Sequence, residues 1–300
     1  MDPLILGLIG FACALLLLVF RVPIAFSLAG VSSTFILLFF AMRNGGFDMV
    51  SAVAPTLSMV SSNTFALVHS YDLSMIPLFV LLGHISYHTG ITTDIYHAAR
   101  VWLKRLPGGV AMASVFGCGG FSAITGSSIA CASAMGKICV PEMLRMGYDK
   151  RLATSTVAVG GTLGSLIPPS VLFIVYGIFT EMSVSRLFMA GVIPGLISLL
   201  GFLVVIYVWV KRNPAVAPVD DTILEKGERR KAAIRCWPAM MLFTIIIGGI
   251  YGGLFTATEA AAISAFVVIV IGSLQKRLNW SQFILSIKDT CTQTTSIFFI

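Results

Sequence analysis

The chain has 300 residues, of which 57% are hydrophobic and only 11% are charged, and its mean hydropathy is +0.94. Soluble domains carry about a quarter charged residues, so this composition excludes a water-soluble globule. The net charge of +7 does not indicate a nucleic-acid partner, because the basic residues cluster in short segments between apolar runs. We therefore expect a protein that crosses the lipid bilayer several times and binds no nucleic acid.

The first 88 residues predict three crossings. Leu4–Phe20 has no basic segment before it and no cleavage site of small residues after it, so it is expected to be a retained span and not a signal peptide. Residues 21–23 form a short turn into the second span, Ile24–Met42. Residues 43–71 are of mixed polarity and are expected to lie at the interface. Ser74–His88 is the third predicted crossing.

The following segments alternate between polar and apolar. Thr93–Leu106 is too polar to span, but its apolar residues recur at helical spacing, which indicates a helix lying flat at the membrane surface. Further along, Leu187–Val210 is a span and Asn213–Cys236 is a charged linker. Two more spans are expected at Pro238–Leu254 and Ala260–Leu274.

The segment Leu106–Gly136 has 31 residues without one Asp, Glu, Lys or Arg, and basic clusters flank it on both sides. A single crossing would place one of these clusters outside, and two full crossings need about 40 residues. Two half-helices of about 13 residues on either side of a turn would fit. We expect a re-entrant hairpin with its tip at Ser122–Ser128, although close helix packing would also explain some of the small residues.

The next apolar segment, Leu152–Thr180, is interrupted between Gly160 and Ser170. Pro168 and Pro169 remove two backbone donors, and the preceding glycines are expected to loosen the helix. A simple proline kink is the alternative. Broken helices offer carbonyls that suit Na⁺ and amides that suit a carboxylate. Because neither interrupted segment contains a charged residue, Na⁺ is favoured over a proton as the coupling ion.

The basic residues also predict the orientation of the chain. With the N-terminus on the periplasmic side, all of the 20 Lys and Arg except Arg43 and Arg186 fall in cytoplasmic segments.

Several other residues admit a structural or a functional interpretation. His84 and His88 are four residues apart and could bind a metal, but no third ligand accompanies them, so structural histidines are favoured. Glu259 is expected to cap a helix, and Glu142 to pair with Arg145. The six cysteines are interpreted as small buried residues.

Three stretches, Phe121–Glu181, Leu187–Leu196 and Gly252–Phe266, resemble the large membrane (M) subunit of tripartite ATP-independent periplasmic (TRAP) transporters. The resemblance implies a multi-pass protein of the bacterial inner membrane that imports an organic acid, such as a C4-dicarboxylate or sialic acid, with Na⁺ by an elevator-type movement. It also implies two partners, a small (Q-type) membrane subunit and a periplasmic solute-binding protein. No cofactor beyond the coupling Na⁺ is expected.

The same resemblance implies the residues of the site. Sodium is expected to be bound by residues of the hairpin tip and the facing helix break, namely Ser122, Thr125, Gly126, Ser127, Ser128, Gly164, Ile167 and Pro168. The solute is expected to contact Ser127, Ser128, Pro169 and Ser170.

We therefore expect an all-α fold of the inverted-repeat ion-transporter type. Residues 1–212 form the first repeat, with scaffold helices over 1–105, the hairpin and broken helix over 106–180, and a closing span over 187–210. Residues 213–236 are the cytoplasmic linker, and residues 237–300 begin a second repeat. Because the family's large subunits continue for another hundred or more residues, the chain is expected to be truncated and inactive alone.

Three other functions are weighed against transport of this kind. A channel could also use unwound carbonyls. An intramembrane protease would need Ser122, Ser127 or Ser128 with His84 as its base, and no motif places these residues together, so the chain is not expected to be an enzyme. A purely structural scaffold would tolerate changes at Ser127 or Pro168.

Overall fold

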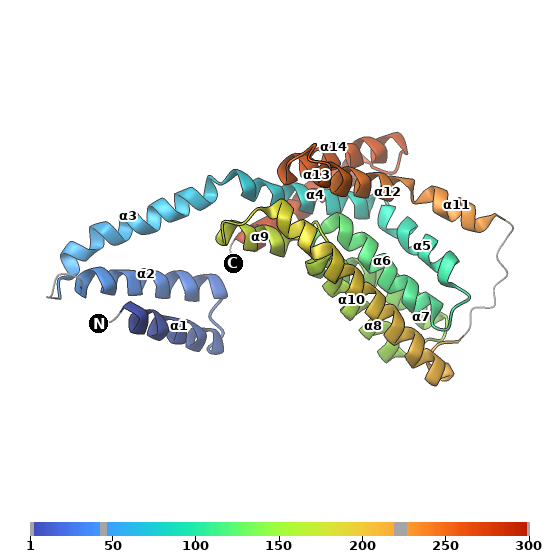
Figure 1. Ribbon diagram of the computed structural model, residues 1–300, viewed down its shortest axis with the longest axis horizontal. Coiled ribbons are helices and arrows are strands. Elements are labelled where there is room, and N and C mark those ends of the chain that lie inside the picture. Colours follow the sequence, from blue (N-terminus) through green and yellow to red (C-terminus); the bar gives the residue numbers. More distant parts are fainter. Residues whose placement is uncertain (1–2, 43–46, 219–226, 299–300) are drawn as a thin grey trace. The chain divides into compact units, whose positions relative to one another are not determined.

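The computed structural model describes residues 3–42, 47–218 and 227–298, which are helical and contain no β-strand (Figure 1). Helices satisfy their own backbone hydrogen bonds, as a segment in hydrocarbon must. Within these ranges four helices are long and apolar enough to cross a membrane, and two bent helix pairs bring the total to as many as six. The chain is therefore a polytopic all-α membrane protein, as the composition predicts.

The chain divides into two compact units, and the first comprises Met1–Tyr71 together with Thr295–Ile300. It contains the contacting helices α1 (Pro3–Val19), α2 (Ile24–Met42) and α3 (Met49–Val68). Residues 43–46 lie outside the described residues. Most of the segment predicted to be interfacial is thus one helix of 20 residues.

Asp48 caps the start of α3 by accepting hydrogen bonds from the backbone N–H groups of Val50 and Ser51. Hydrogen bonds from Ser51 and Val50 lower the pKa of the Asp48 carboxyl from its ordinary value. This turn before α3 therefore holds an ionised side chain.

The second unit, Asp72–Thr294, holds the interrupted segments. Its first seven α-helices in chain order are α4 (Met75–His88), α5 (Ile91–Leu103), α6 (Gly109–Thr125), α7 (Ser128–Arg145), α8 (Lys150–Leu166), α9 (Val171–Phe179) and α10 (Val184–Arg212). Helix α6 is at the centre, because it contacts α4, α5, α7, α8 and α10 and 15 of its 17 residues are buried. This helix is apolar on all sides, which suits a core position. Helix α5 is found where a surface helix is predicted, and its position relative to the membrane stays a prediction.

The C-terminal part of the second unit differs from the prediction in three places. Part of the predicted linker is a helix, α11 (Glu228–Arg235), which packs on α5, while residues 219–226 lie outside the described residues. The predicted span from Pro238 is α12 (Trp237–Phe243), a π-helical turn (Thr244–Gly248) and α13 (Gly249–Tyr251). After α14 (Ala257–Leu274), a helix that sequence analysis did not anticipate follows, α15 (Trp280–Phe298), which belongs to the second unit up to Thr294.

Two smaller predictions can be checked directly. The Thr256 hydroxyl accepts a hydrogen bond from the Glu259 amide (3.3 Å), and the Glu259 carboxylate accepts one from the Thr256 amide (2.8 Å), so the predicted helix cap is confirmed. The interpretation of the cysteines is correct for the buried Cys118, Cys131 and Cys139 but wrong for Cys13 and Cys291, which are exposed. Cys236 is half-buried.

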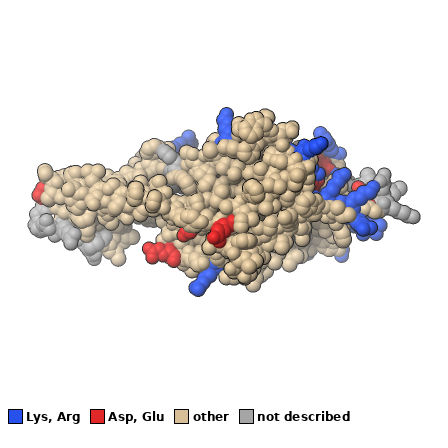
Figure 2. Space-filling model, turned by 90° about the horizontal axis from the view of Figure 1, so that it is seen from above, with Lys and Arg blue, Asp and Glu red and all other residues tan. Residues whose placement is uncertain are grey.

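Charged side chains are sparse on the surface. Uncharged residues cover most of the face drawn in Figure 2, and Lys and Arg gather mainly at one end of the view. A surface with so few charged side chains is typical of a protein that lies largely in hydrocarbon.

Candidate functional site

Helices α6 and α7 form a hairpin that turns at Gly126 and Ser127. Helix α6 ends because Gly126 adopts a left-handed conformation (φ +63°) and donates its N–H to the Ser122 carbonyl at 2.9 Å. Ser127 then caps α7, since its hydroxyl accepts a hydrogen bond from the Ala130 amide at 3.3 Å. The break therefore lies inside the predicted tip, Ser122–Ser128.

The two arms of the hairpin run antiparallel. The Cys131 thiol contacts the Cys118 carbonyl at 3.5 Å near the tip, and the Ser114 hydroxyl contacts the Met143 sulfur at 3.8 Å further away. The arms have 17 and 18 residues, which corrects the predicted length of about 13, because α7 continues past Gly136 to Arg145. The depth that the hairpin reaches in the membrane stays a prediction.

The second break separates α8 from α9. Helix α8 ends at Leu166, Ile167 and Ser170 have extended backbones, and the peptide bond between Pro168 and Pro169 is cis. The hydroxyl of Ser170 donates to the Ser165 carbonyl at 2.9 Å and so satisfies one acceptor at the end of α8. The prolines interrupt this helix as predicted.

The prediction that glycines loosen this helix is wrong, because α8 runs through all three of them. Each glycine instead lies where a neighbour approaches closely. A Cβ atom at Gly160 would be 2.9 Å from the Cys118 sulfur, and one at Gly161 would be 2.8 Å from the Ala132 Cβ. These glycines allow α8 to pack tightly against both arms of the hairpin.

The tip of the hairpin lies directly against the proline break. The Gly126 carbonyl accepts a hydrogen bond from the Val171 amide at 3.0 Å. A Cβ atom at Gly126 would be 2.3 Å from the Pro169 carbonyl oxygen, and one at Gly164 would be 2.8 Å from the backbone of Ser127 and Ser128. Two segments about 40 residues apart in the chain thus meet backbone to backbone.

Not every predicted site residue points into this junction. Thr125 is buried against α4, where only a glycine, Gly83, leaves room for it. The side chain of Ile167 packs toward Gly195 of α10, so only its backbone is available at the break. Ser122 is fully buried on α6, one turn before the tip, and Pro168 is buried in the break itself.

The junction obtains its electrostatic character from helix ends. The C-terminal ends of α6 and α8 and the N-terminal ends of α7 and α9 meet there, and neither Leu106–Gly136 nor Gly160–Ser170 contains a charged side chain. Helix C-termini carry partial negative charge and N-termini partial positive charge. The arrangement can therefore bind a small cation and an anionic group next to each other.

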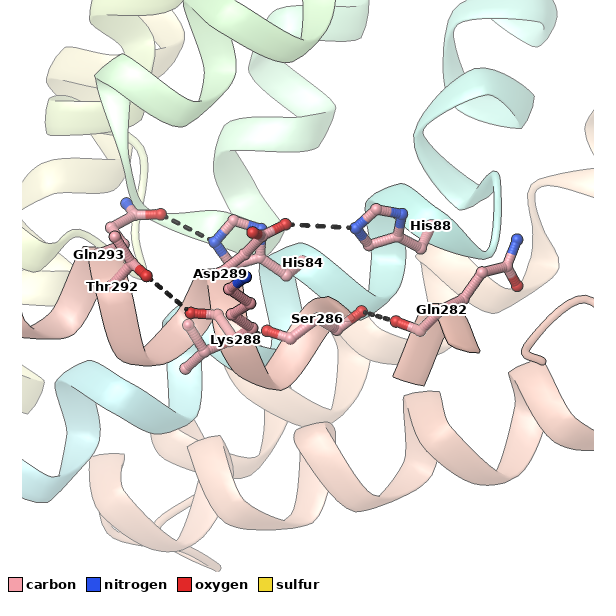
Figure 3. A network of polar contacts seen from close by, with 9 residues as sticks. His84, His88, Gln282, Ser286, Lys288, Asp289, Thr292 and Gln293 are labelled. Atoms are coloured by element: carbon pink, nitrogen blue, oxygen red, sulfur yellow. Dashed lines mark hydrogen bonds and ion pairs between the residues drawn. The ribbon is translucent and has the colours of Figure 1, made fainter. Parts of the chain in front are cut away.

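A third element, α15, contributes polar side chains that the sequence analysis missed (Figure 3). Gln293 donates its amide N–H to the Ser127 hydroxyl at 3.2 Å, and its amide oxygen lies 2.9 Å from His84 Nε2. Asp289, one turn earlier, lies 3.6 Å from His88 Nε2. The spacing of the polar residues on this helix is a signal that could have revealed the buried face: Gln282, Ser286, Asp289 and Gln293.

His84 thus has a hydrogen-bond partner, which agrees with the structural interpretation, whereas the 3.6 Å contact of His88 with Asp289 is longer than a hydrogen bond. Among the described residues no group of three or more His, Cys, Asp or Glu could hold a metal ion.

Two ion pairs of α5 lie away from the junction. Glu142 pairs with Arg100 of α5, which corrects the predicted pair with Arg145. Arg277, after α14, pairs with Asp94 of α5 at 2.5 Å. Helix α5 is therefore tied by charge to the hairpin and to α14.

Uncharged discontinuous helices that meet inside a polytopic all-α membrane protein are the architecture of secondary transporters. Residues 11–300 match the family model of the tripartite ATP-independent periplasmic transporter, DctM component. The chain belongs to this family, and its apolar helices agree with a multi-pass protein of the inner membrane.

Curated relatives agree with this assignment. The C4-dicarboxylate TRAP transporter large permease protein DctM of Pseudomonas aeruginosa is 40% identical over 207 residues, covering 67% of this chain and 47% of the relative. Its namesake in Vibrio cholerae is 37% identical, covering 83% of this chain and 52% of the relative. The sialic acid TRAP transporter large permease protein SiaM of Vibrio cholerae is 29% identical, covering 87% of this chain and 62% of the relative. The chain spans about half the length of the curated relatives it matches.

Proposed function

We propose that this chain forms part of a permease that takes up an organic acid together with Na⁺. The observation that carries the proposal is the junction between the hairpin tip and the proline break, where four helix ends meet without a formal charge. Relatives whose names specify C4-dicarboxylate and sialic acid support a carboxylate as the solute. The remaining partners would be a small membrane subunit and a periplasmic solute-binding protein.

In this proposal the two kinds of helix end have different roles. Carbonyl oxygens at the C-terminal ends of α6 and α8 bind Na⁺, which needs oxygen ligands but no formal charge. Amides at the N-terminal ends of α7 and α9 face the carboxylate of the solute. The residues proposed for both roles are those implied by the resemblance: Ser122, Thr125, Gly126, Ser127, Ser128, Gly164, Ile167, Pro168, Pro169 and Ser170.

We further propose that the hairpin re-enters the membrane from the cytoplasmic side and that the N-terminus is periplasmic. The antiparallel arms return the chain to the side on which it entered, and both ends of the hairpin carry basic residues. The hairpin and broken helix would then move together, elevator-like, because their tips are joined backbone to backbone.

The test is uptake by the complete transport system that contains this chain, reconstituted in liposomes with the cognate binding protein. Radiolabelled succinate and N-acetylneuraminate serve as the probes. We expect saturable uptake of one of them that requires an inward Na⁺ gradient and is lost when K⁺ replaces Na⁺. Equal uptake in K⁺ would refute Na⁺ coupling, and a flux that does not saturate would indicate a channel.

A further inference from the structure

Gln293 faces His84 of α4 on one side (Figure 3) and contacts Ser127 at the tip of the hairpin on the other. Its amide oxygen is 2.9 Å from His84 Nε2, and its amide nitrogen is 3.2 Å from the Ser127 hydroxyl oxygen. The Asp289 carboxylate, one turn away, lies 3.6 Å from His88 Nε2 and so brings α15 next to α4 at a second point. A hydrogen-bonded series of three side chains, His84, Gln293 and Ser127, thus ends at the residue that caps α7.

The hydrogen bonds at Ser127 decide what its hydroxyl can bind. A hydroxyl has two acceptor lone pairs and one proton to donate. Ser127 Oγ accepts one hydrogen bond from the Ala130 amide at 3.3 Å and a second from Gln293 at 3.2 Å. Both lone pairs are then engaged, and only the O–H remains for a ligand.

A hydroxyl that can only donate prefers an anion to a cation. Sodium would need one of the lone pairs, so it would have to displace either the helix cap or Gln293. A carboxylate oxygen, in contrast, accepts the free O–H without breaking either bond, and hydrogen bonds to a charged acceptor are the stronger kind.

The orientation of the Gln293 amide goes together with one tautomer of His84. With the proton on Nε2, the histidine donates to the Gln293 oxygen, and the amide N–H₂ must then face Ser127. If Gln293 were turned the other way, its oxygen would take the Ser127 proton and leave none for a ligand. In this orientation His84 holds the amide oxygen of Gln293, and the amide nitrogen of Gln293 holds the Ser127 hydroxyl oxygen.

We propose that Gln293 is a positioning residue that presents the Ser127 hydroxyl as a donor to the carboxylate of the solute. Ser127 then belongs to the solute site and not to the Na⁺ site, and α15 becomes a third component beside the hairpin and the broken helix. The proposal rests on the proposed function for the presence of a carboxylate. The choice between anion and cation rests on the hydrogen bonds alone.

The experiment compares two constants for the same reconstituted transport system, the KM for the transported probe, succinate or N-acetylneuraminate, and the Na⁺ concentration for half-maximal uptake. We expect Ser127→Ala and Gln293→Leu each to raise the KM about tenfold. The Na⁺ constant should change less than about twofold. The double variant should be no worse than Ser127→Ala alone, since Gln293 acts through Ser127.

Matched variants separate positioning from damage to the fold. Gln293→Glu replaces the N–H donor by an acceptor, so it should raise the KM at least as much as Gln293→Leu. Gln282→Glu makes the same change on the same helix but keeps the acceptor that Gln282 offers to the Asn279 amide at 3.0 Å, and it should leave both constants unchanged. Ser127→Thr keeps the hydroxyl and should retain most of the affinity for the solute.

A shift in the Na⁺ constant with an unchanged KM would overturn the proposal and assign Ser127 to the cation. Additive effects of Ser127→Ala and Gln293→Leu would overturn the positioning role. These results require uptake by the unmodified system. If that system takes up neither probe, the proposed function fails and the carboxylate assignment fails with it. If the uptake proceeds without Na⁺, only the coupling ion is refuted, and the KM comparison still decides the role of Gln293.

Discussion

The two ends of the hairpin formed by α6 and α7 differ in their side chains: the open end, here called the base, carries charged residues, and the tip at Gly126 and Ser127 carries none. At the base, Glu142 pairs with Arg100, and Asp149 caps α8 by accepting hydrogen bonds from the amides of Arg151 (2.8 Å) and Leu152 (3.3 Å). At the tip, the turn is made by Gly126, and the nearest neighbour is the backbone of the proline break. The base uses charged side chains and the tip uses none.

This difference follows from what each end must do. Charged caps and ion pairs carry little desolvation penalty where water reaches them. A buried charge, in contrast, costs on the order of several kcal/mol unless it is paired. Two backbone segments can meet only by a close approach, which glycine permits. The tip should therefore be sensitive to added volume, and the base to the loss of hydrogen bonds and charge.

The largest effect is expected from Gly126→Ala. The new methyl group would meet the Pro169 carbonyl and would also be strained at φ +63°, so we expect the free energy of unfolding in mixed micelles to fall by roughly 3 kcal/mol. Gly90→Ala is the control, because Gly90 has φ +77° but no neighbour within 4 Å. It should cost only about 1 kcal/mol. Equal losses would mean that contact with the break contributes nothing.

A smaller effect is expected from Gly164→Ala on the facing helix. Its Cβ would lie 2.8 Å from the backbone of the tip, which cannot move as a side chain can. We expect a loss of about 2 kcal/mol. Gly136→Ala, on α7, has only Val157 at 3.8 Å and should be neutral or stabilising by up to about 1 kcal/mol. If both variants gained stability alike, the tip would not be packed against α8.

The sequence located the hairpin and the break because the signals there are local. Pro168 and Pro169 lack the donors that a helix needs, whatever surrounds them. The role of the glycines in α8 could not be predicted from such local signals. Gly160 and Gly161 suit either a loosened turn or a close neighbour, and only the positions of Cys118 and Ala132 decide between the two.

The sequence analysis also failed to predict contacts between residues that are far apart in the chain. Glu142 was predicted to pair with Arg145, the nearest basic residue at helical spacing, but the fold brings Arg100 of α5 to it. Gln293 was overlooked because it lies 166 residues from Ser127. Its place on a polar face of α15 was visible in the sequence, but which helix that face contacts depends on the tertiary packing.

The base of the hairpin can be tested through Glu142. Glu142→Gln removes the carboxylate charge that faces the half-buried Arg100 guanidinium, and we expect a loss of about 1 kcal/mol in the free energy of unfolding. Arg145→Gln, which removes the exposed partner predicted from the sequence, should change stability by less than about 0.5 kcal/mol. A larger loss of stability in Arg145→Gln than in Glu142→Gln would support the Glu142–Arg145 pair predicted from the sequence. High salt should reduce the effect of Glu142→Gln, whereas it should not change that of Gly126→Ala.

The smallest effect is expected from Asp149→Ala, which removes the cap of α8 and should cost roughly 0.5–1 kcal/mol. Asp149→Ser and Asp149→Asn should recover most of this loss, because a hydroxyl or amide oxygen can accept the same amide hydrogen bonds. Recovery by several side chains is what distinguishes the base from the tip, where a hydrogen atom is the only substituent that fits at Gly126. Unfolding titrations of these variants beside Gly126→Ala and Gly126→Ser measure that contrast. It would be contradicted if Gly126→Ser were tolerated as well as Asp149→Ser.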